Sequence, residues 1–243
     1  METLRSESGR FLKDIRMSKG LTLNQVSKRL SFFLFLLFFI PGIIFPQDPL
    51  RFKNEIDTVI KKYSPQAGSK NLIVFTGSSS IRRWQNISGY FPGENIINTA
   101  FGGSQMSDLI FYSDQAIIRY KPVQVFIYEG DNDLGAGEKA ADILREADSL
   151  IKIIHKELPV TEIVILSAKP SPLRWAFKDE FLKLNRMFSQ LPVKYDYVRY
   201  LDLWTSLIGP SGRPVSEYFI SDSLHLNNSG YRKWAPVIGK VLK

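Results

Sequence analysis

Short apolar runs that alternate with amphipathic stretches constrain the fold of this chain more than any other feature. The apolar runs are residues 72–75, 95–98, 123–128, 160–167 and 197–203. Apolar side chains recur at helical spacing in residues 48–63, 105–120, 138–157, 175–190 and 229–242. Strands that alternate with helices of this length are typical of parallel βαβ units with right-handed crossovers. The sequence therefore predicts an α/β protein, a three-layer α/β/α sandwich around a five-stranded parallel sheet.

The composition of the chain limits its size class, its binding partners and the chemistry open to it. The chain has 243 residues, 44% of them hydrophobic, which is enough for one domain with a sizeable core. The formal net charge is +8, but residues 1–30 carry seven Lys/Arg and three Asp/Glu, and so hold half of it. The remaining body is only mildly basic and has no long basic run, which argues against a nucleic-acid partner. The chain has no cysteine, which excludes a disulfide, a thiolate metal site and a cysteine nucleophile.

A nearly continuous apolar segment spans residues 32–45, is interrupted by Pro41-Gly42 and follows Lys28-Arg29. As a helix it would span about 21 Å, less than the ~30 Å hydrocarbon core of a bilayer. A positive flank, a short apolar region and a helix breaker are typical of a secretory signal. We therefore expect residues 1–47 to be a signal peptide or, if uncleaved, a membrane anchor. The protein would then be exported, to the periplasm or out of the cell.

A second interpretation of the N-terminus is a membrane-anchored DNA-binding regulator. Residues 11–16 and 21–26 resemble the first two helices of a phage-repressor-type helix-turn-helix. The third helix, which such a domain needs to close its core, is replaced by the phenylalanine-rich segment. This alternative therefore depends on residues 11–30 alone.

The run at residues 72–75 leads directly into Thr76-Gly77-Ser78-Ser79-Ser80. A glycine allows a sharp turn, and the serines stand where a strand gives way to a helix. One interpretation is a helix N-cap, for which serine is among the preferred residues. The other is a nucleophile, because open α/β sheets bind ligands at the carboxyl ends of their strands. The turn alone favours the N-cap, and the rest of the chain has to argue for the nucleophile.

Polar residues and glycines also follow other predicted strands. Gly102-Gly103 come after the second strand, Gly130-Asp131-Asn132-Asp133 after the third, and Asp222-Ser223-Leu224-His225 before the last helix. Carboxyl ends of parallel strands meet at one edge of a sheet, so we expect these segments to gather near the serines. A hydroxyl, hydrogen-bond donors and an Asp/His pair are the parts that an acyl-transfer site requires.

The chain offers only two histidines as a base for a serine. His155 lies inside the predicted helix at residues 138–157 and is expected at the surface, whereas His225 lies three residues after Asp222. That spacing allows the carboxylate to accept the Nδ1 proton, which leaves Nε2 to face a serine. Taken alone, Asp222 is better explained as an N-cap or turn residue, and His225 as a structural histidine.

A tetrahedral intermediate needs preorganised N–H donors about 3 Å from its oxyanion. Gly103 can offer an unobstructed backbone N–H, Asn132 its side-chain amide, and Ser79 its own backbone N–H. The alternative is that the two glycines form a plain turn and Asn132 an Asx turn.

Together these segments resemble the sequence blocks of the SGNH (GDSL-type) hydrolases, a family of serine esterases and lipases. In the family's order, its blocks match Gly77 through Ser80, Asn98 through Gly103, Gly130 through Asp133 and Asp222 through His225. The resemblance covers about residues 70–240. It implies a flavodoxin-like fold, the SGNH hydrolase fold, for a domain at residues 48–243.

The resemblance also implies roles for single residues. Ser79 would be the nucleophile, and Asp222 and His225 would complete the triad. Ser79, Gly103 and Asn132 would form the oxyanion hole. Neither a cofactor nor a metal is implied.

Two positions depart from the family's first block. Ser78 stands in place of its Asp and Ser80 in place of its Leu. The chain is more similar to a branch that begins Gly-Ser-Ser-Ser-Ile-Arg than to the founding lipases. No lid or large apolar insertion is visible, so the resemblance favours an esterase over a lipase.

Several cationic or large aromatic side chains fall at or beside the predicted active edge. They are Arg82, Arg83, Trp84, Lys169, Arg174 and Trp175. They could receive an anionic or sugar-like substrate. We favour buried tryptophans and solvated arginines instead, since large aromatic side chains are mostly buried.

The sequence thus predicts a serine esterase that cleaves carboxylic esters, above all short-chain acyl or acetyl esters, through an acyl-enzyme. Its partner would be a small-molecule or carbohydrate ester, with no nucleic acid, and with a membrane contacted only through residues 1–47. The alternative is a non-catalytic carbohydrate- or cell-envelope-binding module that keeps the fold. The sequence leaves the oligomeric state open.

Overall fold

The computed structural model describes residues 48–243. Residues Pro49–Lys243 form one compact unit. The predictions made for residues 1–47, a signal peptide or anchor and the helix-turn-helix alternative, lie outside the described residues. In the part that is described, no helix combines the length and the apolar character needed to cross a bilayer.

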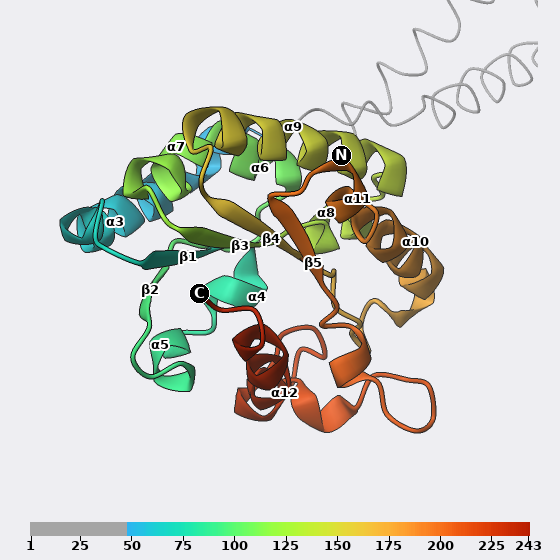
Figure 1. Cartoon of the computed structure of the whole chain (residues 1–243). Coiled ribbons are helices and arrows are strands. Elements are labelled where there is room, and N and C mark those ends of the chain that lie inside the picture. Colours follow the sequence, from blue (N-terminus) through green and yellow to red (C-terminus); the bar gives the residue numbers. More distant parts are fainter. Residues whose placement is uncertain (1–47) are drawn as a thin grey trace, which may run out of the picture. The chain divides into compact units, whose positions relative to one another are not determined.

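Five parallel strands form one sheet in the order β2-β1-β3-β4-β5 (Figure 1). The strands are β1 (Leu72–Gly77), β2 (Asn95–Asn98), β3 (Gln124–Tyr128), β4 (Glu162–Leu166) and β5 (Val198–Leu201). Each strand is parallel to its neighbours, which confirms the predicted five-stranded parallel sheet. The central strands β1 and β3 are buried along their whole length. Strands buried on both faces are continuous apolar runs, which explains their clear sequence signal.

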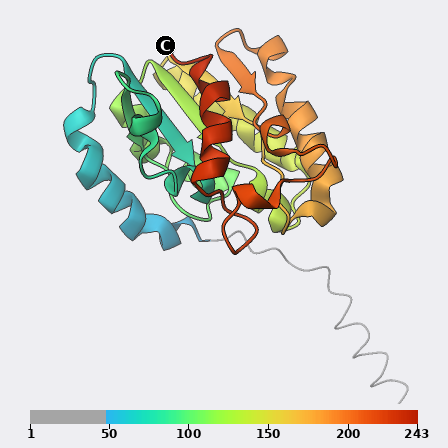
Figure 2. The same cartoon turned by 90° about the horizontal axis from the view of Figure 1, so that it is seen from below.

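Helices cover both faces of this sheet, as the three-layer prediction requires (Figures 1 and 2). One face carries α3 (Lys53–Tyr63), α6 (Met106–Phe111), α7 (Ser113–Ala116), α9 (Ala140–Glu157) and α10 (Lys178–Phe188). The other face carries α4 (Ser79–Arg82), α5 (Ile87–Tyr90) and α12 (Asn228–Gly239). Figure 2 shows α12 lying across this second face. Two short helices, α8 (Asp131–Gly135) and α11 (Leu191–Lys194), complete the α-helices of the described residues.

Two apolar cores result from the alternation of side chains along each strand. On β1, Leu72 and Val74 pack into one core, and Ile73 and Phe75 into the other. Successive side chains of a strand point to opposite faces of the sheet, so a single buried strand serves both layers. Short 3-10 turns connect the elements: Pro49–Phe52, Ser64–Gln66, Ile118–Tyr120, Trp175–Phe177, Thr205–Leu207 and Ser216–Tyr218.

One predicted helix differs clearly from the structure. Residues 105–120 form α6, α7 and a 3-10 turn instead of one continuous helix. The backbone leaves the helical region at Tyr112 (ψ 17°) and again at Ile117 (φ −134°). Apolar spacing survives both breaks, because each short segment still turns its apolar side chains toward the sheet. Periodicity alone therefore could not locate them.

Candidate active site

Ser79 is the first residue of α4, just beyond the carboxyl end of β1. Gly77 makes the turn possible, since its φ is +115° and an added Cβ would overlap the backbone carbonyl of Tyr128 on β3. The Ser78 amide donates to that same carbonyl at 3.0 Å. Ser78 is the N-cap residue of α4, but its side chain makes no capping hydrogen bond. Ser78 therefore occupies the N-cap position without the side-chain hydrogen bond that makes serine a preferred cap.

The structure brings Ser79, His225 and Asp222 together across 146 residues of sequence. His225 Nε2 lies 2.8 Å from Ser79 Oγ, and His225 Nδ1 lies 2.6 Å from Asp222 Oδ2. A carboxylate can only accept, so the ring proton stays on Nδ1. Nε2 is then free to accept the proton of the Ser79 hydroxyl. This is the arrangement needed to activate a serine.

Asp222 is held in its ionised form. Its Oδ1 accepts hydrogen bonds from the amides of Leu224 and His225, both at 2.9 Å. Burial acts to raise the pKa of Asp222, but the hydrogen bonds from the amide and ring of His225 outweigh it and lower the pKa to about 2. The carboxylate is therefore charged throughout the neutral range.

The last helix fixes the Asp222–His225 loop to the serine turn. Asn227 caps α12 by accepting hydrogen bonds from the amides of Ser229 and Gly230, at 2.8 and 3.2 Å. Farther along α12, the Tyr231 hydroxyl donates to the Ser80 carbonyl of α4 at 2.9 Å. One helix therefore positions both the histidine that precedes it and the turn that carries Ser79.

The candidate oxyanion donors follow the carboxyl ends of three different strands, β1, β2 and β3. Gly103 has φ +83°, is exposed, and has no atom within 4 Å of where a Cβ would lie. Within residues 48–243, no acceptor takes the backbone N–H of Gly103 or of Ser79. Asn132 Nδ2 donates one proton to the Ser104 carbonyl at 2.9 Å, which leaves its second proton available. The loops are also joined to each other, because the Phe101 amide donates to the Gly77 carbonyl at 3.0 Å.

Asn98, the first residue of the second block, supports the site through hydrogen bonds to backbone groups. Its Nδ2 donates to the carbonyls of Ile81 and Trp84, at 2.7 and 3.3 Å. Its Oδ1 accepts from the Ala100 amide at 3.2 Å. The side chain thus ties α4 to the start of the glycine loop.

The cationic and aromatic candidates divide into two groups. Trp84 is buried, with 2% of its surface exposed, and Arg82 and Arg83 are exposed, as predicted. Lys169 is fully buried and the Arg174 side chain is 17% exposed, and both form ion pairs with Asp131. Sequence reasoning missed this cluster; the opposite charges at the ends of β3 and β4 were its only local signal.

Two other candidate side chains, Trp175 and His155, each stack on an aromatic ring. Trp175 is only half-buried and stacks on Trp204 with ring centroids 6.0 Å apart, so the expectation of a buried tryptophan is wrong there. His155 is partly exposed, as expected, and its ring stacks on Tyr197 near the end of α9 with centroids 3.6 Å apart.

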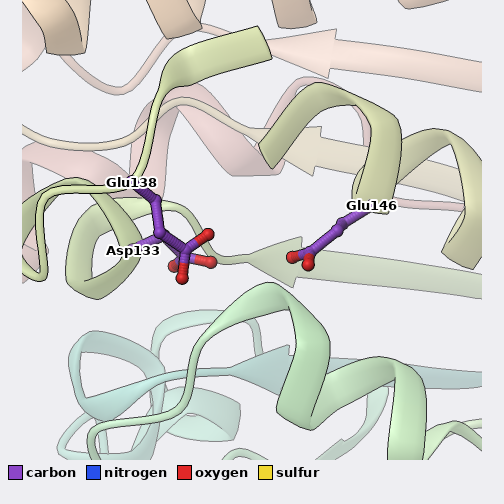
Figure 3. Close-up of side chains that lie close together, drawn as sticks. All are labelled: Asp133, Glu138 and Glu146. Carbon is purple, nitrogen blue, oxygen red and sulfur yellow. The ribbon is translucent and has the colours of Figure 1, made fainter. Parts of the chain in front are cut away.

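A group of three carboxyl groups lies beside Asn132 in the sequence. Figure 3 shows Asp133, Glu138 and Glu146 close together, and their oxygens lie within 4.8 Å of one another. Asp133 is buried and accepts from the amides of Met106 at 2.8 Å and Gly130 at 3.1 Å. Burial raises its pKa to about 7. These bonds give Asp133 a structural role, and acidic groups alone do not identify a metal site.

An open cavity of about 750 Å³ lies between α3 and α4. Its lining is mostly polar or charged and includes Lys62, Arg82, Arg83 and Asn98. No triad residue lines it, although α4 carries both Ser79 and Arg82. The cavity adjoins the glycine loop, since a Cβ on Gly102 would lie 3.1 Å from the Arg82 side chain.

The parallel five-stranded sheet, with Ser79, His225 and Asp222 brought together beyond a strand end, has the fold of the SGNH class of hydrolases. Within that class, the chain belongs to the GDSL-like lipase/acylhydrolase family, whose model matches residues 67–233. The protein is accordingly a hydrolase.

Solved structures with this fold are similar over most of the chain. A Streptococcus pneumonia protein provisionally described as a platelet activating factor has a TM-score of 0.68 at 22% identity, over 79% of this chain and 94% of that one. A GDSL-like lipase from Bacteroides thetaiotaomicron has a TM-score of 0.62 at 16% identity, over 80% of this chain and 97% of that one. A catalytic mutant of an acetylxylan esterase from Geobacillus stearothermophilus has a TM-score of 0.61 at 15% identity, over 73% of this chain and 96% of that one. Among curated proteins, none matches this sequence.

Proposed function

We propose that this protein is a serine esterase that cleaves carboxylic esters through an acyl-enzyme on Ser79. The observation that carries the proposal is the continuous hydrogen-bonded chain from Asp222 through His225 to the Ser79 hydroxyl, with links of 2.6 and 2.8 Å. These are the contacts by which a base removes a proton from a serine and an aspartate stabilises the resulting imidazolium.

The reaction would proceed in two half-reactions. Ser79 Oγ attacks the ester carbonyl while its proton passes to His225 Nε2. The carbonyl oxygen becomes an oxyanion, which accepts hydrogen bonds from the Ser79 and Gly103 amides and from Asn132 Nδ2. When the intermediate collapses, His225 gives the proton to the leaving alcohol. Water then attacks the acyl-enzyme with His225 again as base, which releases the acid and restores Ser79.

We propose short-chain acyl esters, acetyl esters above all, of a small molecule or carbohydrate as the substrate. One protein of similar fold is an acetylxylan esterase, which is consistent with this substrate class. A panel of acetylated sugars and p-nitrophenyl esters of increasing chain length would test it. Highest kcat/KM on long-chain esters would contradict it.

The alternative that the sequence left open is a binding module that keeps the fold without turnover. Hydrolysis of p-nitrophenyl acetate separates the two, with Ser79→Ala as the test variant and Ser149→Ala as its control. Ser149 is an exposed serine on α9, whose hydroxyl bonds only its own helix. The esterase proposal expects turnover that Ser79→Ala abolishes and Ser149→Ala leaves intact. Turnover that survives Ser79→Ala would rule out the acyl-enzyme.

Export remains a separate proposal, based on the apolar segment at residues 32–45 and its positive flank. Cell fractionation of the full chain, followed by mass measurement of the N-terminus, tests it. We expect the protein outside the cytoplasm, either shortened near residue 47 or retained on the membrane. Full-length protein in the cytoplasmic fraction would contradict export.

A further inference from the structure

We propose that Arg174 is a positioning residue that orients the Asn132 amide toward the oxyanion. This inference rests on the proposed esterase function. Arg174 lies between β4 and α10, outside all the segments that carry the family resemblance. Its Nη2 donates to Asn132 Oδ1 at 3.0 Å, and its Nη1 donates to the Asp131 carbonyl at 2.7 Å. The guanidinium also forms an ion pair with the Asp131 carboxylate.

These contacts determine which end of the Asn132 side chain faces the site. Arg174 can only donate, so it selects the amide oxygen. The Ser104 carbonyl can only accept, so it selects the amide nitrogen, at 2.9 Å. Both neighbours therefore favour the same orientation, in which the second Nδ2 proton is left for a ligand. Without Arg174, one of the two constraints on the amide is lost.

The guanidinium also adds charge behind the amide. Asp131 is bound by Lys169 Nζ at 2.6 Å and by the Tyr128 hydroxyl at 2.9 Å, besides Arg174. The Lys169 side chain is fully buried and that of Asp131 is 5% exposed. Two cations face the single Asp131 carboxylate, and one of them, Arg174, contacts Asn132 itself. A fixed positive charge at low dielectric stabilises negative charge that develops on a bound oxygen.

The segment that carries Arg174 is hydrogen-bonded to the loop that carries the catalytic base, His225. The Leu173 amide donates to the Ser223 carbonyl at 3.0 Å, inside the Asp222–His225 loop. Arg174 therefore links the loop that supplies the base to the loop that supplies an oxyanion donor. A residue in this place can align both halves of the site without touching the substrate.

Gly135 offers a way to move Arg174 without removing it. A Cβ on Gly135, the last residue of α8, would lie 2.9 Å from Arg174 Cζ and Nη2. The end of a flexible side chain can yield to that methyl group, so Gly135→Ala should displace the guanidinium and leave the fold intact. Arg174→Lys complements it, because lysine keeps the charge but loses the planar fork.

The experiment measures kcat and KM for p-nitrophenyl acetate in the full chain, with thermal unfolding as a check on folding. Arg174→Lys and Gly135→Ala should each lower kcat by roughly 10- to 100-fold and leave KM within about twofold, since the oxyanion exists only in the transition state. Arg199→Lys is the matched control, an exposed guanidinium that bonds Glu162 at 2.7 Å; it should match the wild type.

A double variant distinguishes positioning from a structural role. If Arg174 acts through Asn132, then Arg174→Lys should cost less than about threefold further in kcat when Asn132→Ala is already present. Losses that multiply in the double variant would overturn the inference, as would wild-type kcat in folded Arg174→Lys and Gly135→Ala. Should Arg174→Lys fail to fold, Gly135→Ala still decides. Absence of Ser79-dependent turnover in the wild type would instead refute the proposed function.

Discussion

Replacing Asp222 with asparagine should place the ring proton of His225 on the wrong nitrogen. In the protein, Asp222 Oδ1 accepts from two backbone amides at 2.9 Å, and Oδ2 accepts from Nδ1 at 2.6 Å. Backbone amides can only donate, so the carbonyl oxygen of an asparagine would take the Oδ1 side. Its NH₂ group would then face Nδ1, which must act as the acceptor. The ring proton would move to Nε2 and point at Ser79.

A ring in that tautomer cannot take the Ser79 proton, and the charge that stabilises the imidazolium is also lost. Removal of these two effects together from a Ser-His-Asp site costs about 10⁴-fold in kcat, or about 5.5 kcal/mol. The backbone around residue 222 keeps its hydrogen bonds, so the fold should persist. Little of the loss should appear in KM, since substrate binding precedes the proton transfer.

The assay compares kcat for p-nitrophenyl acetate in Asp222→Asn and in a matched control, Asp202→Asn. Asp202 also accepts hydrogen bonds three residues ahead, from the Thr205 amide at 3.2 Å and hydroxyl at 2.5 Å, but it faces no histidine ring. The control should keep wild-type kcat. A folded Asp222→Asn variant with kcat within tenfold of the wild type would refute the tautomer argument.

Three further predictions test other parts of the account. Asn132→Ala should lower kcat by about 10²- to 10³-fold with KM little changed. Asn95→Ala, at the opposite end of the sheet, is the control and should keep the wild-type kcat. Equal kcat in the two variants would show that Asn132 does not belong to the oxyanion hole. Gly77→Ala should lower the melting temperature more than Gly93→Ala, because both have positive φ but only Gly77 abuts a neighbouring strand; similar melting would contradict this. Asp133 has a pKa of about 7 when folded and 3.8 as reference, so the folded state holds its proton more tightly. Stability in urea should therefore fall by up to about 4 kcal/mol as pH rises from about 4 to above 7, with a flatter profile in Asp133→Asn; an unchanged slope would contradict the shift.

The fold was predictable because its strongest signals are local. Strands β1 and β3 are buried on both faces, so their residues are apolar without interruption. The helical breaks at Tyr112 and Ile117 were not predictable, because the apolar spacing continues across them. Tertiary contacts decide such breaks; the Thr99 hydroxyl, for instance, donates to the Ala116 carbonyl at 2.7 Å from the end of β2.

The candidate site divides in the same way. The serine turn and His225 could be found because the chain has only two histidines and one serine-rich strand end, and the family resemblance then selects Ser79 from three adjacent serines. Arg174 could not be assigned its place, because its partners lie 42 and 43 residues earlier and a lone arginine in a loop is normally solvated. Pairing between distant charges depends on how the loops pack, and no local pattern encodes it.

The most direct test of the central claim is covalent labelling with a fluorophosphonate, followed by peptide mass analysis. We predict one adduct per chain, on the peptide that contains Ser79, with loss of p-nitrophenyl acetate hydrolysis in proportion to labelling. Ser79→Ala should take up no label. An adduct on another residue, or full hydrolysis by the labelled protein, would contradict Ser79 as the nucleophile.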